Sequence, residues 1–411
     1  MTDQLEQGRA GASGPQPPVV TTPDQREHLL GLDVLRGMAI IGVVVGHIAY
    51  YWGWVYRTGP LELPFLGVDV LRSLLSFSGY GLWLFFLLSG YLLAGTEQRR
   101  ARSGSYSVRS YAMRRALRLV PAYYVAIVLV ILLGPAQTSV VEVVAHASFL
   151  HGLIPATAFT LDGNWWSLTP EVVFYCLLPL IVLKLPRLPQ RLALLGVCLV
   201  VAVATGTYVA VAGLHFVLPS GDPSPWLLTF PTTSLYVFVV GVVLRDVIAR
   251  LDARPASRRR ARLASVLCLL SLAAILVLPY VGAEPYFLAF QNGQDTDGLR
   301  PILADLGTAL AVIAFFTAAL LGAPLLRPFL RSRVLAFVGL ISYSLFLLHG
   351  TVLVISSGRV AAQASALGGE GLLTDWGGFL AFAIAMFAVS GVLAYLSYRF
   401  VESPFLRRKP R

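Results

Sequence analysis

Apolar runs of about 20 residues recur along nearly the whole chain, and this pattern leaves it few ways to fold. A helix of that length rises about 30 Å, which matches the hydrocarbon core of a bilayer. Hydrophobic residues make up 56% of the 411 residues, and charged residues make up only 13%, about half of their share in a soluble domain. The sequence therefore predicts an all-α, polytopic membrane protein.

The sequence contains ten candidate transmembrane helices. Their approximate ranges are 33–55, 74–96, 119–134, 165–184, 193–213, 227–246, 263–282, 302–322, 336–357 and 376–398. Residues 140–154 are moderately apolar but too short for another crossing, so we expect an amphipathic segment at the membrane surface. Residues 1–28 are polar and rich in Pro and Gly, which predicts a disordered tail before a transmembrane domain over 29–406 and a basic tail over 407–411.

The distribution of basic residues predicts how the helices are oriented. With the N-terminus in the cytoplasm, 28 of the 32 Lys and Arg residues fall on the cytoplasmic side and four fall outside. These four are Arg57, Arg72, Arg300 and Arg359. The asymmetry follows the positive-inside rule and predicts cytoplasmic termini in a multi-pass protein of the plasma membrane. Orientation thus explains the net charge of +11, and we expect no nucleic-acid partner.

The first span carries an arginine and a histidine eleven residues apart, Arg36 and His47. Eleven residues turn a helix about 20° past three full turns and raise it about 16 Å, so both side chains lie on one face. Asp33 precedes Arg36 by three residues and shares roughly that face. Because a charge in lipid is costly, we expect this face to point into protein or a wet cavity. The alternative is a packing histidine with an arginine anchored at the membrane edge.

Two more ionisable residues, Glu171 and His349, are expected at a depth similar to that of His47. Trp165 and Trp166 suit the outer interface, and Glu171 follows about 9 Å deeper. His47 and His349 both come out about 10 Å below the outer ends of their spans. Three ionisable groups at one depth indicate a functional site. The alternatives are a proton relay in a transporter, and polar contacts that only hold helices together.

Two smaller patterns concern the cytoplasmic half. Arg114, Arg115 and Arg118, the arginine cluster, lie at the entry of the third span, with Pro121 near the expected helix start. Guanidinium groups suit phosphate oxygens, although lipid headgroups attract the same residues. In the second span, Ser89-Gly90 would let a ligand or another helix approach closely.

Six short motifs follow one another in the order found in a known family. They are Arg36-x10-His47, FFLLSGY (85–91), RR-x-x-R (114–118), WSL-x-x-E-x-x-FY (166–175), ISYSLFLLH (341–349) and VESPF (401–405). On these motifs the chain resembles the acyltransferase 3 family of integral membrane O-acyltransferases, over residues 30–406. The resemblance implies that 29–406 form the acyltransferase domain, and we expect the stand-alone form without a further esterase-like domain.

The resemblance implies transfer of an acyl group, often acetyl, from cytosolic acyl-coenzyme A to a hydroxyl group. Acceptors in the family are sugars of surface polysaccharides and glycolipids, peptidoglycan, and secondary metabolites. Family members depend on the positions matched here by Arg36 and His47, and those matched by Ser89, Gly90 and the arginine cluster also matter. The expected partners are acyl-coenzyme A, such an acceptor and the lipid bilayer, with no permanently bound cofactor and no metal.

These expectations combine into one mechanism. The arginine cluster would bind the coenzyme A phosphates and place the thioester near His47. Neutral His47 would act as general base for the attacking hydroxyl, with an acyl-histidine intermediate as the alternative route. Glu171 or Asp33 would orient the imidazole, and Ser89 or His349 would stabilise the oxyanion. The supporting residues are expected to be Asp33, His349 and Trp166.

Overall fold

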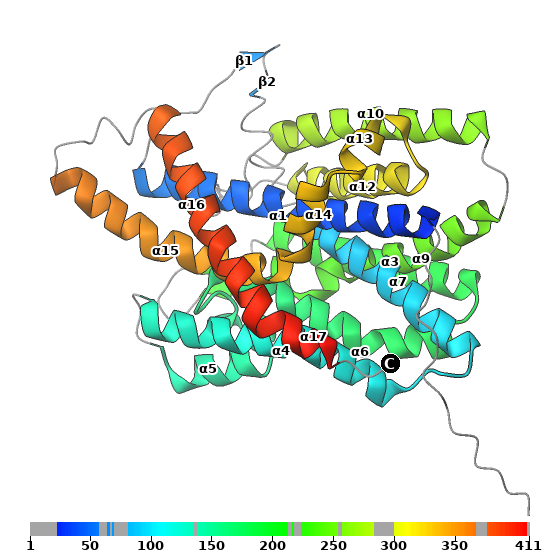
Figure 1. Cartoon of the computed structure of the whole chain (residues 1–411), viewed down its shortest axis with the longest axis horizontal. Coiled ribbons are helices and arrows are strands. Elements are labelled where there is room, and N and C mark those ends of the chain that lie inside the picture. The colour runs from blue at the N-terminus through cyan, green and yellow to red at the C-terminus, as the bar shows by residue number, and fades with distance from the viewer. Residues whose placement is uncertain are drawn as a thin grey trace, which may run out of the picture.

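The computed structural model describes residues 23–56, 64–65, 68–69, 81–134, 138–212, 216–217, 223–224, 226–253, 257–282, 300–366 and 376–408. Within these ranges the chain is almost entirely helical (Figure 1). The long helices are α1 Pro23–Tyr56, α3 Gly81–Arg102, α4 Val108–Leu133, α6 Leu168–Lys184, α7 Leu188–Ala212, α9 Pro231–Asp252, α10 Arg258–Gly282, α12 Arg300–Leu320, α15 Ser342–Ala366 and α16 Trp376–Ser397. The short helices are α5 Val140–Ala147, η2 His151–Leu153, η3 Pro155–Thr157, η4 Gly163–Ser167, α8 Trp226–Thr229, η5 Pro324–Leu326, α13 Arg327–Leu330, α14 Arg333–Leu340, η7 Tyr398–Glu402 and α17 Ser403–Arg407.

Two antiparallel pairs of two-residue strands form the β-structure in these ranges. One pair joins β1 Pro64–Phe65 to β2 Val68–Asp69, and the other joins β3 Phe216–Val217 to β4 Pro223–Ser224. Several expectations fall outside the described residues: the first 22 residues of the predicted tail, the outer Arg57 and Arg72, and the last three residues. Residues 23–28, which we expected in the tail, form the first turns of α1.

Six helices in the described part of the chain are long and apolar enough to cross a membrane. They contain Leu29–Ala49, Val108–Leu133, Gly163–Lys184, Leu188–Tyr208, Arg258–Leu278 and Gly377–Arg407. Two bent helix pairs raise the number to as many as eight: α12 with η5 and α13 bends by 84°, and α14 with α15 bends by 72°. A polytopic helical membrane fold is therefore confirmed, whereas ten crossings and cytoplasmic termini stay predictions.

The start of α4 differs from our expectation. The helix begins at Val108, where the side chain of Ser107 caps it by accepting from the backbone N–H of Ser110. The arginine cluster therefore lies inside the helix, and Pro121 lies well within it rather than near its start. Proline inside a membrane helix is tolerated where neighbouring helices satisfy the freed backbone groups. The expectation for 140–154 is confirmed in one respect, because α5 has only eight residues and is too short to cross.

Helix α1 runs across the middle of the molecule and packs against α3, α14 and α15 (Figure 1). Its approach to α14 requires glycine on both helices. A Cβ atom on Gly37 would lie 2.0 Å from the carbonyl oxygen of Leu335, and one on Gly339 would lie 1.9 Å from that of Asp33. Small residues at helix crossings let membrane helices pack by van der Waals contact. This crossing fixes the stretch of α1 that carries Asp33 and Arg36.

Candidate active site

A cavity of about 120 Å³ lies among α1, α3, α4, α6 and α15. Its charged and hydroxyl groups include those of Arg36, Ser89, Arg115, Arg118 and Glu171. The other lining residues are mainly leucine, phenylalanine and tyrosine. Five of the six sequence motifs therefore contribute to one cavity, although they are spread over more than 300 residues of sequence.

His47 lies beyond the lining of this cavity and contacts His349; we call them the histidine pair. Nδ1 of His349 lies 3.0 and 2.8 Å from the carbonyl oxygens of Leu345 and Phe346, which can only accept, so Nδ1 carries the proton in a neutral ring. Nε2 of His349 must then accept, and it lies 2.9 Å from Nδ1 of His47. Nδ1 of His47 is therefore the donor, and Nε2 of His47 keeps its lone pair.

Asp33 pairs with Arg36 rather than with His47. Its carboxylate accepts a hydrogen bond of 2.6 Å from Nη1 of Arg36, the residue one turn along the same helix. His47 lies about 20 Å further along the axis, since 14 residues separate it from Asp33. Of the two groups that we expected to orient the imidazole, Asp33 is thus in place to orient Arg36 instead.

Glu171, the other group expected to orient His47, belongs to the cavity wall. It accepts from the hydroxyl of Tyr175 and, at 3.4 Å, from the hydroxyl of Ser89. These contacts join α3 and α6 on the side of the cavity that faces the arginines. In the described structure, the imidazole of His47 is therefore oriented by His349, which we had expected to stabilise the oxyanion or to support the site.

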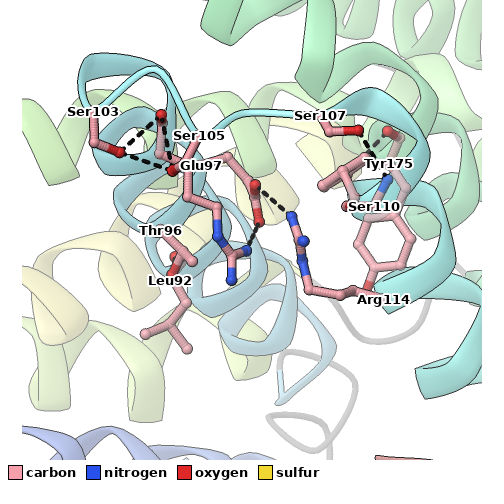
Figure 2. Close-up of polar contacts among 11 residues, drawn as sticks. Leu92, Thr96, Glu97, Ser103, Ser105, Ser107, Ser110, Arg114 and Tyr175 are labelled. Carbon is pink, nitrogen blue, oxygen red and sulfur yellow. Dashed lines mark hydrogen bonds and ion pairs between the residues drawn. The ribbon is translucent and has the colours of Figure 1, made fainter. Parts of the chain in front are cut away.

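Arg114 points away from the cavity and into a buried ion pair. Its guanidinium donates to Glu97 at 2.9 Å, and the other oxygen of Glu97 accepts from Arg100 at 3.1 Å. Figure 2 shows Glu97 between the two guanidinium groups, beside the turn that joins α3 to α4. Because Arg114 is only 5% exposed, the pair holds α3 against α4 instead of facing a ligand.

Arg118 lines the cavity and is braced by a residue from the other end of the chain. It forms an ion pair with Glu402, whose second oxygen accepts from the hydroxyl of Ser344 at 3.1 Å. The guanidinium also lies 5.4 Å from the ring centre of Tyr343. In the sequence, only the VESPF motif (401–405) marked Glu402 as a candidate for a role in the site.

Arg115 forms an ion pair with neither Glu97 nor Glu402, the partners of Arg114 and Arg118. Its guanidinium lies 6.0 Å from the ring centre of Tyr111 and 5.7 Å from that of Tyr175. Its Nε is buried without a hydrogen-bond partner, and no carboxylate among the described residues forms an ion pair with it. Arg115 is therefore the member of the cluster that is most available to an anion entering the cavity.

Ser89 and Gly90 separate into two roles. Ser89 lines the cavity. Gly90 faces α9, where a Cβ would lie 2.1 Å from the carbonyl oxygen of Phe238, and Gly241 makes the reciprocal close approach to Leu87. Gly90 is thus a helix-packing glycine, which is the alternative that the sequence had left open. Its position does not support the expectation that it contacts the donor.

The segment between α5 and α6 contacts α15 on both sides of His349. Trp165 donates its Nε1–H to the carbonyl oxygen of Leu347 at 3.1 Å, and Thr351 donates its hydroxyl to Asp162 at 3.0 Å. A Cβ on Gly350 would lie 2.5 Å from a carboxylate oxygen of Asp162, so glycine is needed for this contact. These contacts fix the position of α15 along its axis.

Trp165 does not belong to the outer belt in which we expected it. Trp165 is fully buried, because its indole N–H has a partner inside the protein, and Trp166 is half-buried. His151 donates to the carbonyl oxygen of Trp165 at 2.9 Å and stacks on His146 with ring centres 4.1 Å apart. Burial lowers the pKa of His146 to about 3 and that of His151 to about 4, so both rings are neutral at pH 7.

Residues 29–395 match the model of the acyltransferase 3 family, described as an acyltransferase domain. The chain is 25% identical to the peptidoglycan O-acetyltransferase OatA of Listeria monocytogenes over 405 residues, which cover 93% of this chain and 57% of OatA. It is 26% identical to nodulation protein 10 of Rhizobium leguminosarum over 240 residues, 53% of this chain and 60% of that protein. The alignments thus cover less than two thirds of either relative, and no solved structure matches the chain.

Proposed function

Because the chain belongs to the acyltransferase 3 family, we propose that it moves an acyl group, acetyl in the simplest case, from cytosolic acyl-coenzyme A to a hydroxyl group. The acceptor is a sugar, a cell-envelope glycan or a secondary metabolite. One relative is named a peptidoglycan O-acetyltransferase, which supports both acetyl transfer and a glycan acceptor.

The observation that carries the choice of donor is the cavity with three guanidinium groups, those of Arg36, Arg115 and Arg118. Coenzyme A is a polyanion, and guanidinium groups bind phosphate oxygens through paired, charge-assisted hydrogen bonds. A proton relay through His47, Glu171 and His349, the transporter alternative, would not need such a site. Glu171 also contacts Ser89 and Tyr175 rather than either histidine, which weakens the case for a relay.

The chemistry follows from the lone pair on Nε2 of His47. In the proposed reaction the acceptor hydroxyl donates to this nitrogen, which takes the proton as the oxygen attacks the thioester carbonyl. The carbon–sulfur bond then breaks, and the imidazolium returns the proton to the departing thiolate. His349 accepts from Nδ1 of His47 throughout and so keeps the imidazole in the productive tautomer. An acyl-histidine route would use the same nitrogen as nucleophile.

Ser89 is the better candidate to stabilise the oxyanion. Both ring nitrogens of His349 already have partners within the protein, whereas the hydroxyl of Ser89 lies on the cavity wall with only a long contact to Glu171. A hydroxyl with a weak partner can turn toward developing negative charge without losing a strong bond. Arg36 adds positive charge on the facing wall.

The proposal includes a topology of ten crossings, over a domain of residues 29–406, with both termini in the cytoplasm of a plasma-membrane protein. The split of basic residues, 28 against four, supports it. In this topology the turn between α3 and α4 faces the cytosol, where acyl-coenzyme A is made, and the segment between α5 and α6 faces outward. The donor then enters from the arginine side, and the histidine pair lies deeper.

Mass spectrometry of cells that carry the wild-type protein or His47→Ala tests the proposal. Glycolipids, wall polymers and small metabolites are compared, after membrane levels of the two proteins have been matched. We expect one class of molecule to lose an acyl group in the variant. Unchanged acylation would reject the role of His47. Proton uptake by proteoliposomes without consumption of acyl-coenzyme A would replace the proposal with the transporter.

A further inference from the structure

Phe346 lies between the cavity and the histidine pair. It is only 8% exposed, it lines the cavity, and its ring centre is 6.1 Å from that of His349. Along α15 the cavity is lined by Ser342, Tyr343 and Phe346, and His349 follows one turn later on the same side of the helix. Among the described residues, the cavity lining on α15 thus ends at Phe346, and the histidines lie behind it.

The charged side chains of the cavity lie toward one end, and the other end is mainly apolar. Moving outward along α6, the lining changes from Tyr175 and Glu171 to Leu168 and Ser167, and the opposing α3 contributes Leu82 at the same outer end. Phe346 faces this apolar end, because the inner part of the same helix face carries Ser342. The arginines lie at the polar end, on α4 and α1. A donor whose phosphates bind the arginines would therefore direct its acyl end toward Phe346.

Phe346 borders this end of the cavity, which as a whole measures about 120 Å³. The thioester must also come within hydrogen-bonding reach of a hydroxyl held by His47, so the acyl group has to pass or displace the ring of Phe346. The methylene groups of a longer acyl chain would need the volume that this ring fills.

We propose that Phe346 closes the apolar end of the cavity and limits the donor to short acyl groups. This inference rests on the proposed function, because it assumes an acyl-coenzyme A donor bound with its phosphates at the arginines. Protein interiors are close-packed, so a smaller side chain at 346 would leave free volume next to the histidine pair. That volume is apolar and suits additional methylene groups.

The test compares the purified wild-type protein with Phe346→Ala and Phe346→Leu. Consumption of acetyl-, butyryl- and hexanoyl-coenzyme A is measured with an extract of membrane glycolipids, wall glycans and small metabolites as acceptor. Since a methylene group in an apolar pocket changes kcat/KM by about tenfold or more, we expect the butyryl-to-acetyl ratio to rise about tenfold in Phe346→Ala and less in Phe346→Leu. Phe346→Leu keeps an apolar side chain if the alanine variant unfolds.

The matched control is Phe382→Leu, because Phe382 is 6% exposed on α16 and does not line the cavity. It should keep the wild-type ratio. Unchanged ratios in both Phe346 variants, with acetyl transfer retained, would overturn the role of Phe346 and leave the proposed function intact. Failure of the wild-type protein to consume any of the three donors would refute the proposed function itself.

Discussion

The three arginines of one motif have three different environments, so their variants should lose different properties, donor affinity in one case and stability in another. Arg115 has no ion-pair partner among the described residues, so Arg115→Met should raise KM for acetyl-coenzyme A about tenfold or more with little change in melting temperature. Arg114→Met leaves Glu97 buried with a weaker set of partners, and breaking such a pair costs about 3–5 kcal/mol. Donor titration and thermal unfolding in detergent measure the two effects.

The double variant Arg114→Met with Glu97→Met is the control for this assignment. Replacing both members of a buried pair by apolar residues is often close to neutral, so the double variant should recover most of the stability lost in Arg114→Met. A loss of donor affinity in the stable double variant, with normal affinity in Arg115→Met, would reverse the roles that we give to the two arginines.

A second prediction concerns the contact between His47 and His349. His349→Ala removes the acceptor for Nδ1 of His47, so the imidazole loses its fixed tautomer. We expect kcat to fall on the order of 100-fold, with KM for acyl-coenzyme A nearly unchanged because His349 lies outside the donor cavity. His349→Gln, which offers an amide oxygen as acceptor, should recover part of the rate. Wild-type kcat in His349→Ala would exclude an orienting role.

For single helices, the sequence predicted correctly which residues share a face. It did not predict the hydrogen bonds and ion pairs that join one helix to another. Helical periodicity was enough to place Arg36 and His47 on one face, because the rule is local. The ion pair of Arg118 with Glu402 joins residues 284 positions apart, and no periodicity carries that information. The interface rule for Trp165 failed for a related reason: its N–H finds a carbonyl on α15, a contact that only the tertiary fold creates.

The segment between α5 and α6, which contacts α15 through Asp162, leads to a prediction about how stability depends on pH. Burial raises the pKa of Asp162 to about 6, so the folded protein binds this proton more tightly than the unfolded chain. That contribution to stability is complete below the ordinary pKa of 3.8 and is lost as the pH rises through about 6. Asp162→Asn stays neutral, and its amide can still bond with Thr351.

The melting temperature of Asp162→Asn relative to wild type should therefore be higher at about pH 8 than at about pH 5. Thermal unfolding in one detergent at both pH values measures this difference. Thr351→Val is the control, since it removes the hydrogen bond to the carboxylate and should destabilise the protein more at high pH, where Asp162 is charged. A difference between Asp162→Asn and wild type that does not change with pH would show that Asp162 is not the titrating group.

At the scale of the whole molecule, the direction of the helices decides whether a cytosolic donor can reach the site. Arg114 of the arginine cluster pairs with Glu97 near the turn between α3 and α4, and the segment between α5 and α6 contacts α15 on both sides of His349. If the arginines face the cytosol, the donor enters from the compartment that supplies it, and the histidines lie toward the outer side. The opposite orientation would separate the arginines from cytosolic acyl-coenzyme A.

Cysteine labelling can test this orientation in cells. Cys176, Cys198 and Cys268 are free thiols, so they are first changed to serine. Ser105→Cys and Ala156→Cys then each place one exposed thiol, in the turn between α3 and α4 and in η3. We expect a membrane-impermeant maleimide to label Ala156→Cys on intact cells, and to label Ser105→Cys only after the membrane is permeabilised. The reverse pattern would place the arginine cluster outside the cell and would refute acyl-coenzyme A of the cytosol as the donor.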